Sequence, residues 1–278
     1  MSKEYSILDS FSFGFGNVKN FPGLIILVFF YSLIRYLNNY LSYIESNHIF
    51  NISLHFGLPW GFPELTNFYS FPEVHESIPE IPSTLVGHII LYTLLFGLFI
   101  FLVKSVLEAG YLGNICVVVS QENNGLDFFG NIKKYGLRIL LFNFIFEFIA
   151  LVLVVVGLTF ATFPSIGFYF GMLMLLGLLL GFLFSFAPYI IVLDNETVYN
   201  ALKKSITIVL SIDGVKYLIL FASITAVTSV AISILLIFPV IGYILSMGVV
   251  SIVGVALTIA ATHFYNQAKT IPQFQNGQ

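Results

Sequence analysis

The fold is decided by residues 187–205, APYIIVLDNETVYNALKKS, where an apolar segment ends and an amphipathic one begins. Before this stretch, residues 166–186 carry no charge and are long enough to cross the roughly 30 Å hydrocarbon core of a bilayer as a helix. After it, apolar side chains recur with the helical period, on a face made of Val198, Ala201, Leu202, Ser205, Ile206, Val209 and Ile212. Asp194 or Asn195 is expected to cap this second helix. The stretch therefore predicts a membrane span that continues into a helix on the membrane surface.

The composition of the chain is that of a multi-pass membrane protein. Of its 278 residues, 58% are hydrophobic and 9% are charged, and the mean hydropathy is +0.96. These values exclude an ordinary soluble domain and predict a single polytopic membrane domain over residues 1–278. The net charge of −3 and the scattered basic residues give no indication of nucleic-acid binding. Cys116 is the single cysteine, so an internal disulfide and a cysteine metal cluster are excluded.

The hydrophobic pattern predicts an all-α integral membrane protein with six transmembrane helices and cytoplasmic amphipathic surface helices. The spans are expected at about 22–40, 84–107, 137–160, 166–186, 215–238 and 240–264. An outer loop, 45–83, contains five of the ten prolines and no Lys or Arg. Basic residues lie at the opposite ends of the spans, including the surface lysines Lys133, Lys134, Lys203 and Lys204. By the positive-inside rule, both termini are predicted to be cytoplasmic in the cell membrane.

Short similar segments predict a threefold internal repeat. GNVKNF at 16–21 is similar to GNIKKY at 130–135, and FPSIGF at 163–168 is similar to FPVIGY at 238–243. The repeated unit would be a surface helix, a span, an outer turn and a second span. Its three copies would cover about 6–107, 126–192 and 195–264.

Three polar side chains within the predicted spans form the candidate intramembrane site. Glu147 lies near the middle of the third span, and Asn143 lies one turn earlier on the same face. A carboxylate at that depth costs about 2.5 kcal/mol or more. Glu147 is therefore expected to pair with Arg35 of the first span, to stay protonated and bond Asn143, or to line a path for a solute or proton.

Small and hydroxyl-bearing residues recur at helical spacing in the later spans. The stripes are Gly177, Gly181 and Ser185; Thr225, Ser229 and Ser233; and Gly242, Ser246, Gly254 and Thr258. Such stripes favour close helix packing and hydrogen bonds between helices, although a polar transport lining would use the same residue types.

The outer loop gives little indication of chemistry. Its histidines, His48, His55 and His75, lack the spacing of a metal site, and an acidic solvated loop is the simpler interpretation. Asn51-Ile52-Ser53 matches a glycosylation sequon on the outer side. The chain contains no recognisable catalytic constellation, cofactor motif or metal-ligand pattern, so we expect no enzyme activity and no cofactor.

Residues 188–194, PYIIVLD, followed by Val198 and by ALKKS at 201–205, resemble a hallmark of a prokaryotic family of six-helix membrane proteins. This family is related to the glycerophosphoryl diester phosphodiesterase membrane domain and the YciC-like group. The resemblance implies the same order of elements along most of the chain. Phosphodiesterase activity in that family belongs to a separate soluble domain, so the resemblance carries no catalytic residue onto this chain. The long outer loop departs from the compact family pattern.

These observations lead to two functional hypotheses. The first is a non-enzymatic multi-pass protein that acts as a membrane partner or scaffold, contacting the lipid bilayer and other membrane proteins or further copies of itself. The alternative is a transporter or channel for a small solute, ion or lipid that uses a Glu147/Arg35 pair. An intramembrane enzyme would require a reactive constellation that the sequence does not display.

Overall fold

The structure is a computed structural model that describes residues 6–45, 55, 57–59, 61–63, 83–120, 126–160, 166–238 and 240–269. All regular secondary structure in these residues is helical, which confirms the predicted all-α class. The helices are α1 (Ile7–Asn17), the short η1 (Val18–Asn20), α2 (Pro22–Glu45), α3 (Ser83–Val119), α4 (Phe128–Phe160), α5 (Ile166–Phe184), α6 (Ala187–Leu193), α7 (Val198–Val209), α8 (Ile212–Leu235) and α9 (Ile241–Ala268).

Several of these helices are long and apolar enough to cross a membrane. Within the described residues, four segments qualify by length and composition: Leu95–Val119, Gly171–Leu193, Ile212–Leu235 and Ile241–Ala268. The pair formed by α1–η1 and α2 is bent by 89° and would add a fifth if it counts as one span. The chain is thus a multi-pass membrane protein. The predicted six spans are not confirmed, because α4, expected to hold the third, is not in this set.

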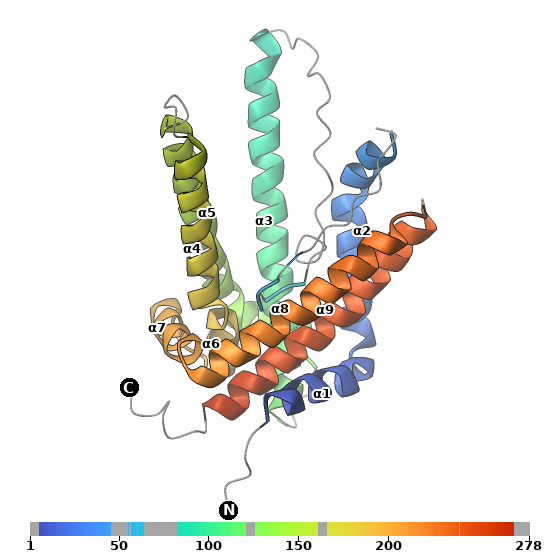
Figure 1. Cartoon of the computed structure of the whole chain (residues 1–278), viewed down its shortest axis with the longest axis vertical. Helices are drawn as coiled ribbons and strands as arrows, with labels where there is room; N and C mark the ends of the chain where they lie inside the picture. Colours follow the sequence, from blue (N-terminus) through green and yellow to red (C-terminus); the bar gives the residue numbers. More distant parts are fainter. Residues whose placement is uncertain are drawn as a thin grey trace, which may run out of the picture.

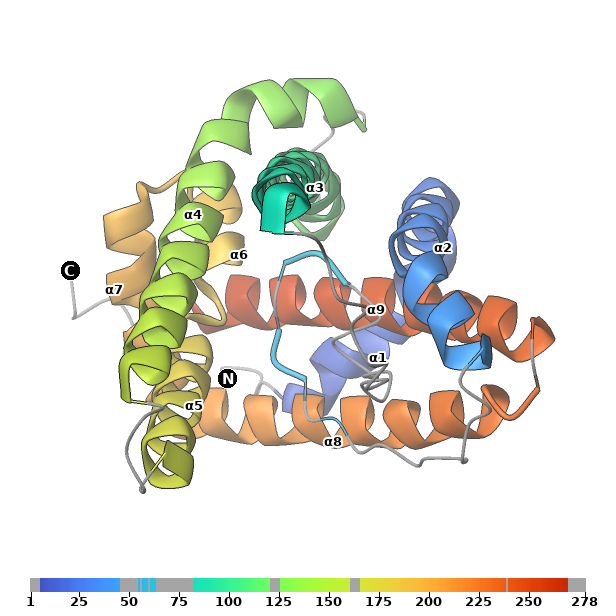
Figure 2. The same cartoon turned by 90° about the horizontal axis from the view of Figure 1, so that it is seen from above.

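Helix α9 lies at the centre of the arrangement. It runs beside α8, and α1 packs across its C-terminal half (Figure 1). Residues 254–262 of α9 are all buried, as expected for a helix that is apolar on every side. From this base α3 and the α4/α5 pair extend away and diverge, while α2 stands on the side opposite α4 (Figures 1 and 2).

A break between α5 and α6 divides one apolar run into two helices. Pro188 lies at the start of α6, where its missing N–H is tolerated. The hydroxyl of Ser205 on α7 accepts from the Phe186 amide at 3.2 Å and donates to the Leu183 carbonyl at 2.9 Å. The surface helix therefore provides the hydrogen bonds that the break removes.

Helix α7 confirms the predicted amphipathic helix, with local differences. Its buried face holds Val198, Ala201, Ser205, Ile208 and Val209. Of the predicted face, Leu202 and Ile206 are only partly buried and Ile212 is 75% exposed at the start of α8, while Ile208 is buried instead. The cap is Thr197, whose hydroxyl accepts from the Asn200 amide, rather than Asp194 or Asn195. Asn195 instead has a φ of 54°, a left-handed conformation that asparagine tolerates better than most residues.

Part of the predicted outer loop lies inside the protein. Gly57, Pro59 and residues 61–63 are buried, between α3, α8 and α9 (Figure 2). The Phe62 ring packs edge-on against Tyr31 of α2 and Tyr111 of α3, with centroid distances of 5.1 and 5.2 Å. The expectation of a solvated loop is therefore wrong for these residues, because their small or apolar side chains fit among the helices. Asn51, like the rest of 46–82 apart from residues 55, 57–59 and 61–63, lies outside the described residues.

Candidate functional site

Asn143 takes part in a polar contact between α4 and α3. Its side-chain amide donates to the Ser105 hydroxyl at 3.1 Å and to the Glu108 carboxylate at 2.8 Å. Ser105 and Glu108 lie one turn apart on α3, inside the candidate span Leu95–Val119. The structure thus joins Asn143 to Glu108, and not to Glu147 as the sequence suggested.

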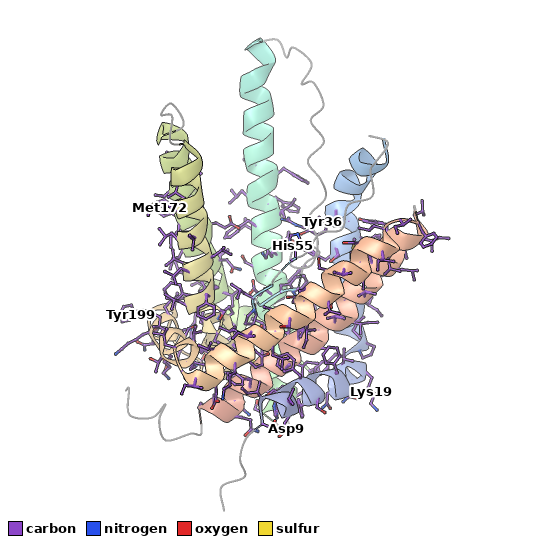
Figure 3. All side chains as sticks on the ribbon, in the orientation of Figure 1. Asp9, Lys19, Tyr36, His55, Met172 and Tyr199 are labelled. Carbon is purple, nitrogen blue, oxygen red and sulfur yellow. The ribbon has the colours of Figure 1, made fainter. Side chains whose placement is uncertain are left out.

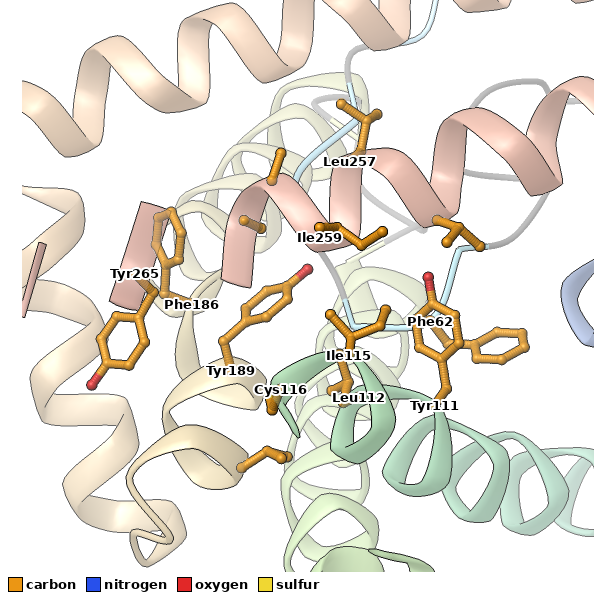
Figure 4. Packing of buried hydrophobic residues seen from close by; sticks show 14 of the residues in the cluster. Phe62, Tyr111, Leu112, Ile115, Cys116, Phe186, Tyr189, Leu257, Ile259 and Tyr265 are labelled. Carbon is orange, nitrogen blue, oxygen red and sulfur yellow. The ribbon is translucent and has the colours of Figure 1, made fainter. Parts of the chain in front are cut away.

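Glu108 is the buried carboxylate of this region, with 3% of its surface exposed. The backbone of Gly61 presses against it so closely that a Cβ at residue 61 would overlap the carboxylate. Tyr111 and Tyr189 lie in the same buried cluster, and their hydroxyls point toward α9 (Figure 4). Thr258 of α9 lies beside both rings and donates its own proton to the Gly254 carbonyl at 2.9 Å. Helices α3, α4, α6 and α9 and the backbone of Gly61 therefore meet near the Glu108 carboxylate.

Sequence reasoning missed Glu108 because the second span was expected to end at residue 107, which placed this glutamate at the membrane surface. The helix continues to Val119, and residues 108–116 are all buried. The uncharged sequence from Ala109 to Val119 is the signal that could have extended the span past Glu108.

Glu147 lies on the exposed surface of α4. One turn before it, Asn143 still contacts α3, but the two helices diverge beyond that point (Figure 1). The large apolar residues around Glu147 are also exposed: Phe144 by 56%, Phe148 by 55% and Leu151 by 59%. The expected burial of Glu147 within the bundle is therefore not what the structure shows.

The depth of Glu147 follows from its neighbours. Phe146 packs edge-on against Phe184, with a centroid distance of 5.8 Å, and Phe184 lies well inside the candidate span Gly171–Leu193. Asn143 contacts the middle of the candidate span of α3. Glu147 thus lies beside two candidate spans, and an ionised carboxylate that faces lipid costs about 2.5 kcal/mol or more.

Arg35 is not brought together with Glu147. It lies on α2, partly buried, and its Nε donates to the Tyr36 hydroxyl at 3.3 Å. Tyr36 on α2 and Met172 on α5, the helix paired with α4, stand on opposite sides of the molecule (Figure 3). The Glu147/Arg35 pair of the transporter hypothesis therefore has no support in this arrangement.

Residues of the hydroxyl and glycine stripes of α8 and α9 contact His55, Gly57 and Pro63. Thr225 accepts from the Gly57 amide at 2.8 Å, and Ser229 accepts from the His55 amide at 3.1 Å. Gly254 leaves room for Pro63, whose ring a Cβ at residue 254 would overlap. These three residues of the stripes thus pack against non-helical residues, whereas the sequence predicted packing between helices. Non-helical backbone at membrane depth requires such internal partners.

A charged cluster joins the ends of α6, α7 and α9. Asp194 accepts from the Tyr265 hydroxyl and lies 3.3 Å from Lys269 Nζ and 3.6 Å from Lys204 Nζ. Lys204 also contacts Glu196 at 2.8 Å. Lys204 therefore points into this cluster, although the sequence grouped it with the surface lysines.

The ion pairs of this cluster shift the pKa values of Glu196 and Lys204. The hydrogen bond from Lys204 lowers the pKa of Glu196 below its ordinary value of 4.5, helped by a second bond from Asn200. Burial alone would lower the pKa of Lys204, but Glu196 and Asp194 together raise it above 10.5. Nearby, Arg138 of α4 donates to the backbone and side-chain oxygens of Asn195. Lys133, Lys134 and Lys203 are exposed.

The site and the fold define the class of protein as a multi-pass α-helical membrane protein. In the part of the chain that the structure describes, there is no group of three or more His, Cys, Asp or Glu residues placed to hold a metal ion. Comparison with protein-family models, with curated proteins and with solved structures finds no match for this chain. The resemblance to the six-helix prokaryotic family stays a prediction.

Proposed function

We propose that this protein is a non-enzymatic membrane partner, which uses its divergent helices to receive another membrane protein. The proposal rests mainly on the exposure of these helices. Leu95, Phe96, Gly97, Leu98 and Phe99 of α3 are all exposed. Since successive residues of a helix are about 100° apart, five in a row cover every side of it.

The α4/α5 pair supports the same proposal. Its exposed residues include Phe144 and Phe148 on α4 and Leu175 and Leu178 on α5. Helices associate in membranes through side-chain packing and polar contacts. This pair exposes apolar side chains for packing, and Glu147 of α4 offers a polar group among them.

Photo-crosslinking within the native membrane tests this proposal. A photoreactive phenylalanine analogue at Phe148 should give a discrete adduct with a second protein, which mass spectrometry identifies. The matched position is Ile219 of α8, which is 62% exposed and lies on another helix. Adducts with lipid alone from both positions would contradict the proposal.

A second function, transport of a small solute or ion, is favoured by a different observation. Glu108 is buried in a candidate span and is contacted by the non-helical residues around Gly61, an arrangement that suits a binding site within a membrane protein. This proposal replaces the Glu147/Arg35 pair with Glu108. Purified protein in vesicles should then mediate a flux of cations or protons that Glu108→Gln abolishes and Asp213→Asn leaves intact. Equal fluxes from vesicles with and without the protein would rule it out.

A further inference from the structure

We infer that the face of α4 around Glu147 binds a transmembrane helix that carries a lysine or arginine at the depth of Glu147. This inference rests on the proposed role as a membrane partner and adds the chemistry of the partner. The face consists of Phe144, Glu147, Phe148 and Leu151, all exposed.

Glu147 lies beside two candidate membrane spans. The adjacent residue Phe146 packs on Phe184 inside one candidate span, and Asn143, one turn away, bonds to Ser105 inside another. Glu147 therefore lies alongside two segments that are long and apolar enough to span a membrane. Carboxylates within membrane spans are rare in lipid-facing positions and mark contacts with other polar groups.

The apolar and acidic side chains of this face indicate which kind of helix would bind it. The stacked rings of Phe144 and Phe148, with centroids 6.3 Å apart, and the Leu151 side chain offer an apolar surface for packing. Glu147 adds a carboxyl group beside them. A basic side chain on an otherwise apolar helix satisfies both features, whereas lipid tails satisfy the apolar part and leave the carboxylate in hydrocarbon.

A second copy of this chain is a poorer fit to the same face. In a twofold dimer the same patch contacts itself, so two Glu147 carboxylates would approach each other. Like charges at short distance oppose ionisation of both groups. A helix that carries a basic side chain is therefore the better fit to this face.

The experiment uses the full-length protein in lipid nanodiscs and two synthetic leucine-rich peptides of about twenty residues, one with a central lysine and one with leucine there. Binding is measured by energy transfer from a fluorophore on the protein to one on the peptide. The lysine peptide should bind at least about tenfold more tightly than the leucine peptide, because the ion pair forms in a medium of low dielectric constant.

Three variants separate the explanations. Glu147→Gln should reduce the ratio of the two affinities to about one, Asp213→Asn should preserve it, and Phe148→Ala should weaken both peptides alike. Asp213 is a carboxylate at the start of α8, remote from this face in the chain. Equal affinities of the two peptides for the unaltered protein would overturn the inference, as would a preference that survives Glu147→Gln.

Two further measurements test the identity of the partner. Dimers in single-molecule photobleaching that disappear in Glu147→Gln would show that a second copy occupies the face, and would overturn the inference. A protein adduct at Phe148 in the native membrane, combined with no lysine preference, would refute the inferred chemistry and leave the role as a membrane partner standing.

Discussion

At the scale of single residues, hydroxyl groups and glycines allow irregular backbone to lie inside this membrane protein. Ser205 joins the ends of α5 and α6, and Thr225 and Ser229 bind the amides of Gly57 and His55. Each of these contacts satisfies a backbone group that would otherwise be buried without a partner, which costs several kcal/mol in hydrocarbon.

Replacing Ser205 by Ala should destabilise the protein. The change removes the acceptor for the Phe186 amide and the donor for the Leu183 carbonyl. Ser205 and Phe186 are both fully buried, so water cannot replace these hydrogen bonds. We expect a loss of about 1–3 kcal/mol in the free energy of unfolding, measured by detergent denaturation. Ser223→Ala is the control, because the exposed Ser223 bonds to Ile219 within its own helix. Equal losses from the two variants would contradict this role of Ser205.

Gly61→Ala should be destabilising because of Glu108. The added methyl group would overlap the buried carboxylate, and forced packing of this kind costs about 1–3 kcal/mol. In a Glu108→Ala background the same change should cost less, since the obstructing group is gone. Gly16→Ala, where the new methyl group meets open space, should be nearly neutral. A cost of Gly61→Ala that is independent of Glu108 would disprove the contact.

At the scale of elements, α7 connects several helices of the protein. Its buried face packs on α5, α6 and α8, its Ser205 holds the α5–α6 break, and its Lys204 holds Asp194 and Glu196 beside the end of α9. Lys203, the preceding residue of the same helix, is exposed. The two lysines therefore have different roles although they are neighbours in the sequence.

Lys204→Gln should lower stability by up to about 1 kcal/mol, whereas Lys203→Gln should have almost no effect. The difference depends on pH. The pKa of Glu196 is lowered in the folded protein, so its contribution is present above pH 4.5 and lost as the pH falls below that value. The pKa of Lys204 is raised, so its contribution is present below pH 10.5 and lost above it. Thermal melting of both variants between pH 3.5 and 8, roughly, should show the Lys204→Gln deficit shrinking toward acid pH. A constant deficit would refute the ion pair.

At the scale of the whole molecule, the helices form a packed base and divergent arms. The base contains α1, α6, α7, α8 and α9, and the arms are α3 and the α4/α5 pair (Figure 1). A helix bundle normally covers most of the apolar surface of its members. The exposed surfaces of these arms are therefore available to lipid and to a partner, as proposed above.

The predicted orientation of the molecule can be checked by thiol labelling in a Cys116→Ala background. A cysteine at the exposed Lys203 position should react with a membrane-impermeant reagent only after the membrane is permeabilised, because basic residues favour the cytoplasmic side. A cysteine at Phe238, which is 62% exposed between α8 and α9, should react in intact cells. The reverse labelling pattern would refute the predicted orientation.

The sequence by itself determined the helical class, the membrane location and the amphipathic helix after residue 197. These properties depend on the average hydropathy and on the local period of the apolar residues. Both can be read from a short segment of the sequence without knowing what it packs against. It also indicated Ser229, Thr225 and Gly254 as packing residues, because hydroxyls and glycines at helical spacing suit close contacts.

The tertiary structure alone decided which polar groups meet. Glu108 and Glu147 are both carboxylates in long apolar helices, but one is buried against Asn143 and Gly61 and the other is exposed. Nothing in the local pattern distinguishes them, since burial depends on where α3 and α4 touch and where they diverge. The same reason explains the position of Gly57 and residues 61–63, whose insertion depends on helices that are up to about 200 residues away in the chain.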